Sequence, residues 1–247
     1  MVHGGGAHAH WWDHIAPWLV ADDRSVVAVD LSGHGDSGDR MSYSLETWAA
    51  EILAVARDAG IEGPPMLVGH SLGGWSTVVA TADHPESVRA LVLVDCRIID
   101  PEGEERAPAR RPPGRARRVY ATLDEAVARY RPDPAQDGSL PFVIDYLAVT
   151  SAREVEGGWT WKFDPGVLAQ RRPGREALNR ITCPVAILRG ERGLMTPRVT
   201  REMVVALDER ANVVDIPLAG HHMMLDQPLS LVTALRAVLG GWSRRTT

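Results

Sequence analysis

The chain has 247 residues, of which 45% are hydrophobic and 24% are charged, and its formal net charge is −5. This length suits a single domain, the negative charge gives no general attraction for nucleic acid, and no apolar run is long enough to span a bilayer. The two cysteines show neither disulfide nor zinc spacing, and the N-terminal residues lack the pattern of a secretory signal, so we expect buried thiols and a cytoplasmic location.

The first residues, Met1 and Val2, lead directly into the glycine run His3-Gly4-Gly5-Gly6. Backbone N–H groups on such a run can approach a ligand without obstruction from side chains. Four histidines lie in and just after this run, namely His3, His8, His10 and His14. Their spacing matches no zinc pattern, so we expect no metal there, and nothing in the chain implies another cofactor.

Short β-branched runs alternate with helical patterns along the chain, which predicts a mostly parallel sheet flanked by helices. The expected strands are Ser25–Asp30, Pro65–Val68, Ala90–Asp95, Pro184–Leu188 and Asn212–Ile216. An amphipathic helix should begin after Ser44, a favourable N-cap residue, and end at Gly60. Further helices are expected over Leu72–Ala82 and Pro228–Leu239, the second of which opens with proline.

The segment Gly69-His70-Ser71-Leu72-Gly73 joins an expected strand to an expected helix. A serine on such a sharp turn needs glycine at Gly69 and Gly73, because a β-carbon at either position would collide with neighbouring backbone. The turn presents the hydroxyl of Ser71 above the edge of the sheet. Ser71 is therefore the candidate nucleophile.

The strand rhythm stops between Cys96 and Leu178, where helical fragments are expected around Thr122–Tyr130 and Phe142–Arg153. We interpret this stretch as a helical cap inserted after the strand that ends at Asp95. The predicted organisation is a first part of the core over 1–96, a cap over 97–178 and a second part of the core over 179–247. Trp159 in the cap is a candidate substrate-binding residue.

Four segments together resemble the α/β-hydrolase superfamily and occur in the order that this family requires. They are His3-Gly4-Gly5-Gly6, the turn Asp30-Leu31-Ser32-Gly33-His34-Gly35-Asp36-Ser37, the segment around Ser71, and Ala219-Gly220-His221. The resemblance implies an α/β-hydrolase fold in which the usual N-terminal hairpin is missing. An exposed sheet edge would then favour poor solubility or a homodimer.

The resemblance also implies roles for individual residues. His221, which follows a strand and Gly220, would be the general base for Ser71, and the backbone N–H groups of Gly5 and Leu72 would form the oxyanion hole. The neighbouring His222 is a rival to His221 but fits a wall of the site better. The further candidates for substrate binding are Gly4, His70 and His222.

The acid that would orient His221 departs from the common pattern. Gly190-Glu191-Arg192-Gly193 resembles the loop that usually carries the catalytic aspartate, but the matching position is Gly193. Asp95, at the carboxyl end of the preceding strand, and Glu191, within the loop, are the two replacements available. We favour Asp95, because some members of the superfamily carry their acid after that strand.

These residues predict a serine hydrolase that cleaves an ester, lactone or similar acyl bond of a small molecule through an acyl-enzyme. A serine at the turn argues against the epoxide hydrolases and haloalkane dehalogenases, which use a carboxylate nucleophile. Thioester cleavage and carbon–carbon bond hydrolysis remain enzymatic alternatives. A small-molecule receptor that uses the hydrolase site without turnover is the alternative from another class.

Overall fold

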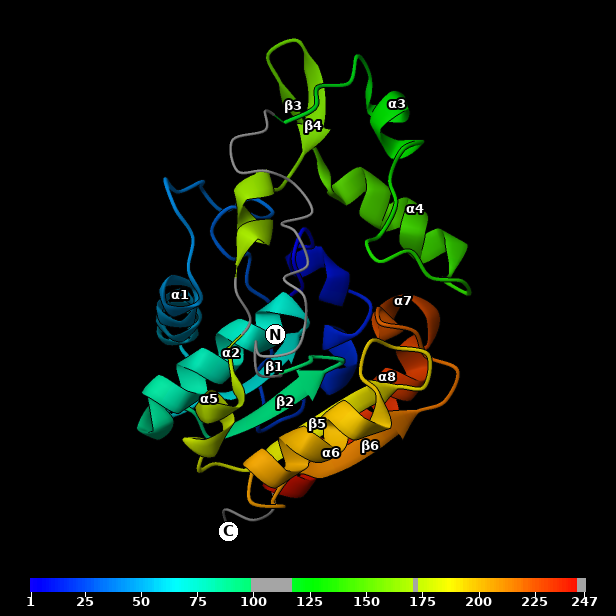
Figure 1. Ribbon diagram of the computed structural model, residues 1–247. Coiled ribbons are helices and arrows are strands. Elements are labelled where there is room, and N and C mark those ends of the chain that lie inside the picture. Colours follow the sequence, from blue (N-terminus) through cyan, green and yellow to red (C-terminus); the bar gives the residue numbers. More distant parts are fainter. Residues whose placement is uncertain (99–116, 171–172, 244–247) are drawn as a thin grey trace.

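The computed structural model describes residues 1–98, 117–170 and 173–243. Its centre is a parallel four-stranded sheet in the order β1-β2-β5-β6 (Figure 1). The strands are β1 (Met66–His70), β2 (Ala90–Val94), β5 (Val185–Gly190) and β6 (Asn212–Ile216). All four were expected from the sequence with ends shifted by at most two residues, and the predicted parallel sheet is confirmed.

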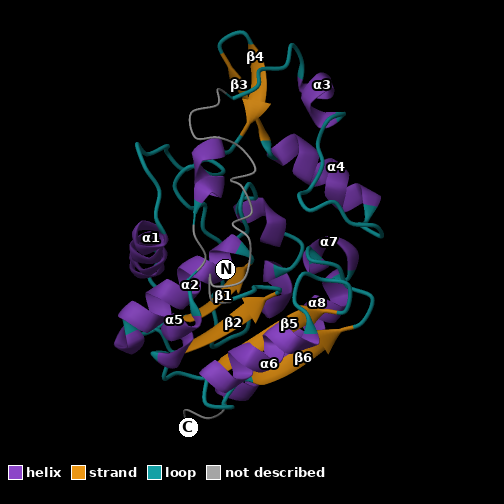
Figure 2. Ribbon diagram, in the orientation of Figure 1, coloured by secondary structure: helices purple, strands orange, loops and turns teal. Residues whose placement is uncertain are grey.

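Side chains alternate between the two faces of the sheet, and each face supports its own hydrophobic cluster. On β2, Leu91 and Leu93 belong to one cluster, whereas Val92 and Val94 belong to the other. Because both faces of this strand are buried, its sequence is apolar throughout instead of alternating with polar residues. Figure 2 shows helices on both sides of the strands.

The first cluster is covered by α1 (Leu45–Asp58), α2 (Leu72–Asp83), α5 (Arg175–Asn179) and α6 (Pro197–Ala206). The second is covered by α7 (Met223–Asp226), α8 (Pro228–Ser243) and the 3₁₀ turns Ala9–Trp12 and Ala16–Leu19. Ser44 caps α1 as expected, its hydroxyl accepting a hydrogen bond from the N–H of Thr47 at 3.1 Å. None of the helices in the described ranges combines the length and apolarity that a bilayer span requires.

The expected strand Ser25–Asp30 is wrong in extent. Val29 forms an isolated bridge with Val2, which also bridges to Gly69 of β1. The N-terminal segment therefore lies between β1 and the 25–30 segment, and after Val2 the chain turns away into the glycine run. Since few residues are available to pair there, the 25–30 segment forms no continuous ladder.

The 97–178 segment, which was expected to form a helical cap, is helical only in part, which corrects the expected helical character. It contains α3 (Leu123–Val127) and α4 (Pro141–Thr150), as expected, but also an antiparallel hairpin of β3 (Ala152–Val155) and β4 (Gly158–Trp161). Glu156 and Gly157 form the turn, and both Gly157 and the first residue of β4, Gly158, have positive φ, at 85° and 140°. A glycine pair between two short alternating runs is a hairpin signal that the sequence carried. Residues 99–116 of the expected cap lie outside the described residues.

The residues that follow the hairpin are held to the glycine-rich turn after the 25–30 segment by backbone hydrogen bonds. The N–H of Gly35 donates to the carbonyl of Lys162, and the N–H of Asp164 donates to the carbonyl of Gly33, both at 2.7 Å. Lys162 also forms an ion pair with Asp36. The glycine-rich turn of the core thus anchors the segment that follows the hairpin.

Because β2 is buried on both faces, truncation of one of its side chains should destabilise the fold. Replacing Leu91, which is fully buried, with alanine should lower the free energy of unfolding by about 2–5 kcal/mol, because a cavity remains on the covered face. Urea unfolding measures this change. Leu229→Ala, at a side chain that is 74% exposed, is the matched control and should change it by less than about 0.5 kcal/mol. Equal losses in the two variants would contradict this account of the core.

Candidate active site

Ser71 occupies the turn between β1 and α2 in a conformation that non-glycine residues rarely adopt, with φ 51° and ψ −119°. The turn is possible because both flanking glycines are in close contact with other atoms. A β-carbon at Gly69 would lie 2.5 Å from Thr77 Oγ1, and one at Gly73 would lie 2.3 Å from the carbonyl oxygen of His3. The serine is therefore held at the carboxyl end of β1 by packing that leaves no room for larger neighbours.

The glycine run near the N-terminus lies against this turn. A β-carbon at Gly4 would lie 3.3 Å from the β-carbon of Ser71, and one at Gly5 would lie 3.4 Å from Leu72 Cδ1. The structure thus brings Gly4, Gly5 and Leu72 together beside Ser71. Leu72 is the first residue of α2, where a helix leaves its N–H groups without intrahelical partners.

Asp95 and His221 form the central polar contact of the site. Asp95 Oδ2 lies 2.6 Å from His221 Nδ1 and also accepts a hydrogen bond from the N–H of Leu194 at 2.8 Å. Both side chains are buried. Asp95 follows β2 directly at φ 40°, and its own N–H donates to the carbonyl of Leu188 on β5. A carboxylate in this position fixes the imidazole tautomer with a proton on Nδ1.

The geometry around Gly193 gives a physical reason for the missing aspartate in the 190–193 loop. A β-carbon at Gly193 would lie 2.3 Å from Asp95 Oδ1. The carboxylate of Asp95 thus occupies the space into which a side chain at Gly193 would project. With its acid at the end of β2, the site therefore requires a glycine at position 193 of the later loop.

Glu191, the alternative acid, points elsewhere. Its carboxylate is exposed and accepts a hydrogen bond from the N–H of Leu218 at 2.7 Å. The structure therefore brings Asp95 to the imidazole of His221 and directs Glu191 toward the loop after β6.

Two further histidines pack on His221. The ring centroids of His70 and His222 each lie 4.7 Å from that of His221, and His222 also contacts Trp11. His70 Nε2 donates to the carbonyl of His221 at 3.0 Å. Burial, reinforced by the neighbouring imidazoles, lowers the pKa of His70 well below its usual value and that of His222 to about 3. Both rings are therefore neutral at pH 7.

Sequence reasoning missed two residues that hold the histidine loop. The Gln136 side chain, from the loop between α3 and α4, accepts from the N–H of His222 at 2.7 Å and donates to its carbonyl at 3.1 Å. Asp226 Oδ2 accepts from the N–H of Gly220 at 2.6 Å, and burial raises the pKa of this carboxyl. Gln136 belongs to no recognisable sequence motif. Only its position in the folded chain shows that it holds the backbone of His222 through two hydrogen bonds.

The remaining candidates lie apart from this group. Trp159 is on β4 and pairs through its backbone with Tyr120, so its role in substrate binding stays a prediction. Of the two cysteines, Cys96 is buried but Cys183 is only half-buried, which corrects one expectation.

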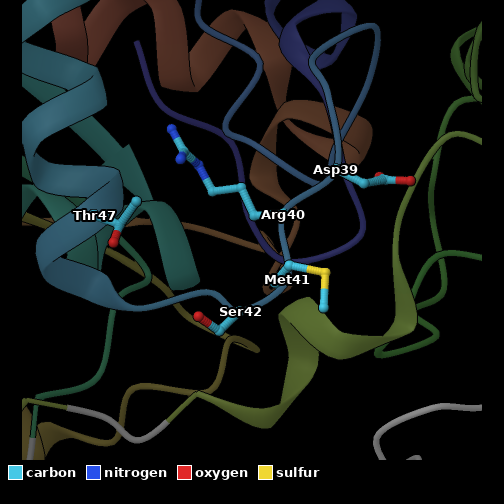
Figure 3. Close-up of a pocket in the computed structure, with 5 residues that line it drawn as sticks. All are labelled: Asp39, Arg40, Met41, Ser42 and Thr47. Carbon is cyan, nitrogen blue, oxygen red and sulfur yellow. The ribbon is translucent and has the colours of Figure 1, made fainter.

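A surface hollow lies between α1 and the loop before it, and it contains none of the residues around Ser71 (Figure 3). It is lined by Asp39, Arg40, Met41, Ser42 and Thr47.

The histidines near the N-terminus have separate partners. His8 Nε2 lies 2.8 Å from Ser151 Oγ, His10 Nδ1 lies 2.6 Å from Asp13 Oδ2, and His14 Nε2 donates to the carbonyl of Met224. His3 lies against His34 instead. These contacts lead to different parts of the chain.

The sequence pattern that defines the alpha/beta hydrolase family matches residues 1–235 of this chain. The chain belongs to the alpha/beta hydrolase family. An esterase of Mycobacterium tuberculosis is 29% identical over 97% of this hydrolase chain and 81% of its own length. A pimeloyl-[acyl-carrier protein] methyl ester esterase of Neisseria meningitidis serogroup B is 27% identical over 99% of the chain and 93% of its own length.

Solved structures agree with this membership. The crystal structure of E-2-(acetamidomethylene)succinate hydrolase superposes with a TM-score of 0.79 at 25% identity, covering 97% of this hydrolase and 90% of that chain. A thioesterase domain from the curacin biosynthetic pathway gives 0.76 at 25% identity, covering 95% and 88%. The α/β-hydrolase fold and an enzyme that hydrolyses acyl bonds, both expected from the sequence, are supported by these relatives.

The contact between Gly193 and Asp95 can be tested with a single methyl group. Gly193→Ala should lower kcat for a short-chain ester by about tenfold or more, because the new β-carbon displaces the Asp95 carboxylate from its place beside His221. Steady-state hydrolysis of such an ester measures the change. Gly38→Ala, at a glycine with no heavy atom within 4 Å of the added carbon, is the control and should leave kcat unchanged. A fully active Gly193→Ala enzyme would contradict this role of the contact.

Proposed function

We propose that the protein is a serine esterase that acts on a small molecule, with Ser71 as nucleophile, His221 as general base and Asp95 as the orienting acid. The observation that carries the proposal is the buried 2.6 Å contact between Asp95 Oδ2 and His221 Nδ1, at the sheet edge where the strained turn presents Ser71. The esterases among its relatives support ester cleavage as the reaction.

The proposed reaction has two steps. His221 Nε2 accepts the proton of the Ser71 hydroxyl while Oγ attacks the acyl carbon, and Asp95 stabilises the imidazolium that forms. The backbone N–H groups of Gly5 and Leu72 bind the developing oxyanion. The imidazolium then donates its proton to the leaving alcohol. In the second step His221 activates a water molecule that hydrolyses the acyl-enzyme and restores Ser71.

A thioester is the second candidate substrate, since the same steps cleave it with a thiol as the leaving group. The curacin thioesterase domain, which shares the fold over most of both chains, supports this candidate. In the cap, Gln136 reaches the histidine loop, so we propose that the 97–178 segment shapes the substrate site. A cytoplasmic location is our further proposal, supported by two cysteines that are both free.

The nucleophile can be identified directly by covalent labelling. A fluorophosphonate probe should label the wild type at Ser71 and fail to label Ser71→Ala, because the probe reacts with a serine activated by a general base. Mass spectrometry of the labelled peptide locates the adduct. Ser71→Ala should also reduce the hydrolysis of short-chain esters to the background rate.

Failure of the folded wild-type protein to label would contradict the proposal and favour a receptor without turnover. Comparison of esters with thioesters of the same acyl chain, in the wild type, then decides between the two candidate substrates through kcat/KM.

The identity of the acid can be tested with a pair of isosteric variants. Asp95→Asn should lower kcat by about 10³–10⁴-fold, because an amide stabilises the wrong tautomer and does not balance the imidazolium charge. Glu191→Gln should leave kcat within about twofold, since its carboxylate contacts only the loop after β6. A silent Asp95→Asn together with an inactive Glu191→Gln would reverse the assignment.

A further inference from the structure

The side chain of Leu168 fills the space beside the glycine run. A β-carbon at Gly5 would lie 3.1 Å from Leu168 Cδ2 and 3.4 Å from Leu72 Cδ1. The isobutyl group of Leu168 therefore packs against the α-carbon of Gly5, one of the two residues whose N–H groups would bind the oxyanion. Leu168 lies outside every motif recognised in the sequence, so only the folded chain brings it to this position.

The backbone that carries Leu168 is firmly held. Leu168 belongs to the 3₁₀ turn Pro165–Ala169, and the side chain of Asp164 caps this turn by accepting from the N–H of Gly166 at 2.8 Å. Asp164 Oδ2 also accepts from the hydroxyl of Tyr43 at 3.0 Å. Val167 is fully buried in the first hydrophobic cluster, against which Leu168 also packs. Leu168 is therefore a fixed surface and not part of a free loop.

Leu168 is also among the accessible residues around the nucleophile. His70 and His221 are buried, whereas Ser71, Gly5 and Leu168 are half-buried. The half-buried residues are those that a small molecule can touch as it approaches the hydroxyl of Ser71. A substrate whose carbonyl oxygen reaches the N–H of Gly5 therefore comes close to the isobutyl group of Leu168.

The position of Leu168 relative to the general base indicates which part of an ester it meets. His221 would donate its proton to the leaving alcohol, so the alcohol lies on the side of His221. The ring of His70 packs on His221, and a β-carbon at Gly4 would lie 2.9 Å from His70 Nδ1. The nearest atoms to Gly5 belong to leucine side chains instead. The glycine run thus leads from the histidines, on the alcohol side, to Leu168 on the acyl side.

We propose that Leu168 forms the end wall of the acyl subsite and thereby limits the enzyme to esters of short straight-chain acids. The proposal rests on the proposed function, because it takes Ser71 as the nucleophile and Gly5 as an oxyanion donor. Replacement of Leu168 by alanine removes every carbon beyond Cβ from the wall. The space that is freed admits further methylene groups of the substrate, and each buried methylene strengthens binding by about fourfold.

Esters that share one leaving group measure the acyl preference. For the p-nitrophenyl esters from acetate to octanoate, kcat/KM of the wild type should fall beyond butyrate. Leu168→Ala should raise kcat/KM for the octanoate relative to the acetate by about tenfold or more, and the larger side chain of Leu168→Phe should lower it for the butyrate. Leu229→Ala, the same truncation at an exposed leucine, is the control and should keep the wild-type ratios. Unchanged ratios in both Leu168 variants would overturn the proposal.

Esters that share one acyl group test the side of the substrate. For methyl, butyl and octyl acetate, Leu168→Ala should keep the wild-type ratios of kcat/KM within about twofold, because the alcohol lies on the side of His221. A change in this series without one in the acyl series would overturn the assignment of Leu168 to the acyl subsite.

A double-mutant cycle tests the contact between Leu168 and Gly5. Gly5→Ala should lower kcat/KM for the acetate by about fivefold or more, because the added carbon lies 3.1 Å from Leu168 Cδ2. In the double variant Gly5→Ala and Leu168→Ala, the new methyl group takes the freed space, so most of this loss should disappear. Strictly additive effects of the two substitutions would contradict the contact.

Calorimetry with the product acids separates the subsite from the reaction, since Ser71→Ala binds them without turnover. Leu168→Ala in this background should bind octanoate about tenfold more tightly or better, with little change for butyrate. Equal octanoate affinity of the two proteins, including no binding by either, would overturn the subsite. Ser71-dependent ester hydrolysis with an unchanged acyl preference would refute the subsite alone. Tighter octanoate binding in a protein whose wild type fails to label with fluorophosphonate would refute the proposed function alone.

Discussion

The short contact between the buried Asp95 carboxylate and the imidazole of His221 is the interaction on which the site depends. A carboxylate removed from water is costly unless hydrogen bonds and a suitable partner compensate for its lost hydration. Oδ2 of Asp95 has both, because the imidazole of His221 is its partner and the N–H of Leu194 donates a second hydrogen bond to it. This oxygen atom therefore joins three segments that are distant in the sequence. They are the end of β2, the 190–194 loop and the histidine loop.

Close approach of backbone segments supplies the rest of the geometry. Gly73 at the start of α2 faces the carbonyls of Val2 and His3, and Gly4 faces His70 and Ser71. The N-terminal run thereby lies directly beside the turn that carries the serine. Gly193 likewise allows a close approach, because its missing side chain leaves room for the Asp95 carboxylate. The unusual backbone of Ser71 persists because these contacts exclude alternatives, and the strain is balanced by the packing around it.

The sequence predicted those parts of the molecule whose signals are local. The turn at Ser71 is recognisable because its glycines are fixed by their immediate neighbours, and apolar runs such as Ala90–Val94 identify strands buried on both faces. Gln136 could not be found, because its two hydrogen bonds to His222 depend on how the loop between α3 and α4 packs against a segment 86 residues later in the chain. The extent of the 25–30 segment was misjudged because strand pairing depends on a partner elsewhere in the chain.

Nitrogen NMR of histidine-labelled protein tests the central claim most directly, because it reports which nitrogen of His221 carries the proton without requiring a substrate. His221→Gln assigns its signals. The account predicts that neutral His221 is protonated at Nδ1 in the wild type and in Glu191→Gln, and that Asp95→Asn abolishes this preference. A tautomer that is unchanged in Asp95→Asn but altered in Glu191→Gln would contradict the account, because Asp95 would then not be the group that orients the imidazole.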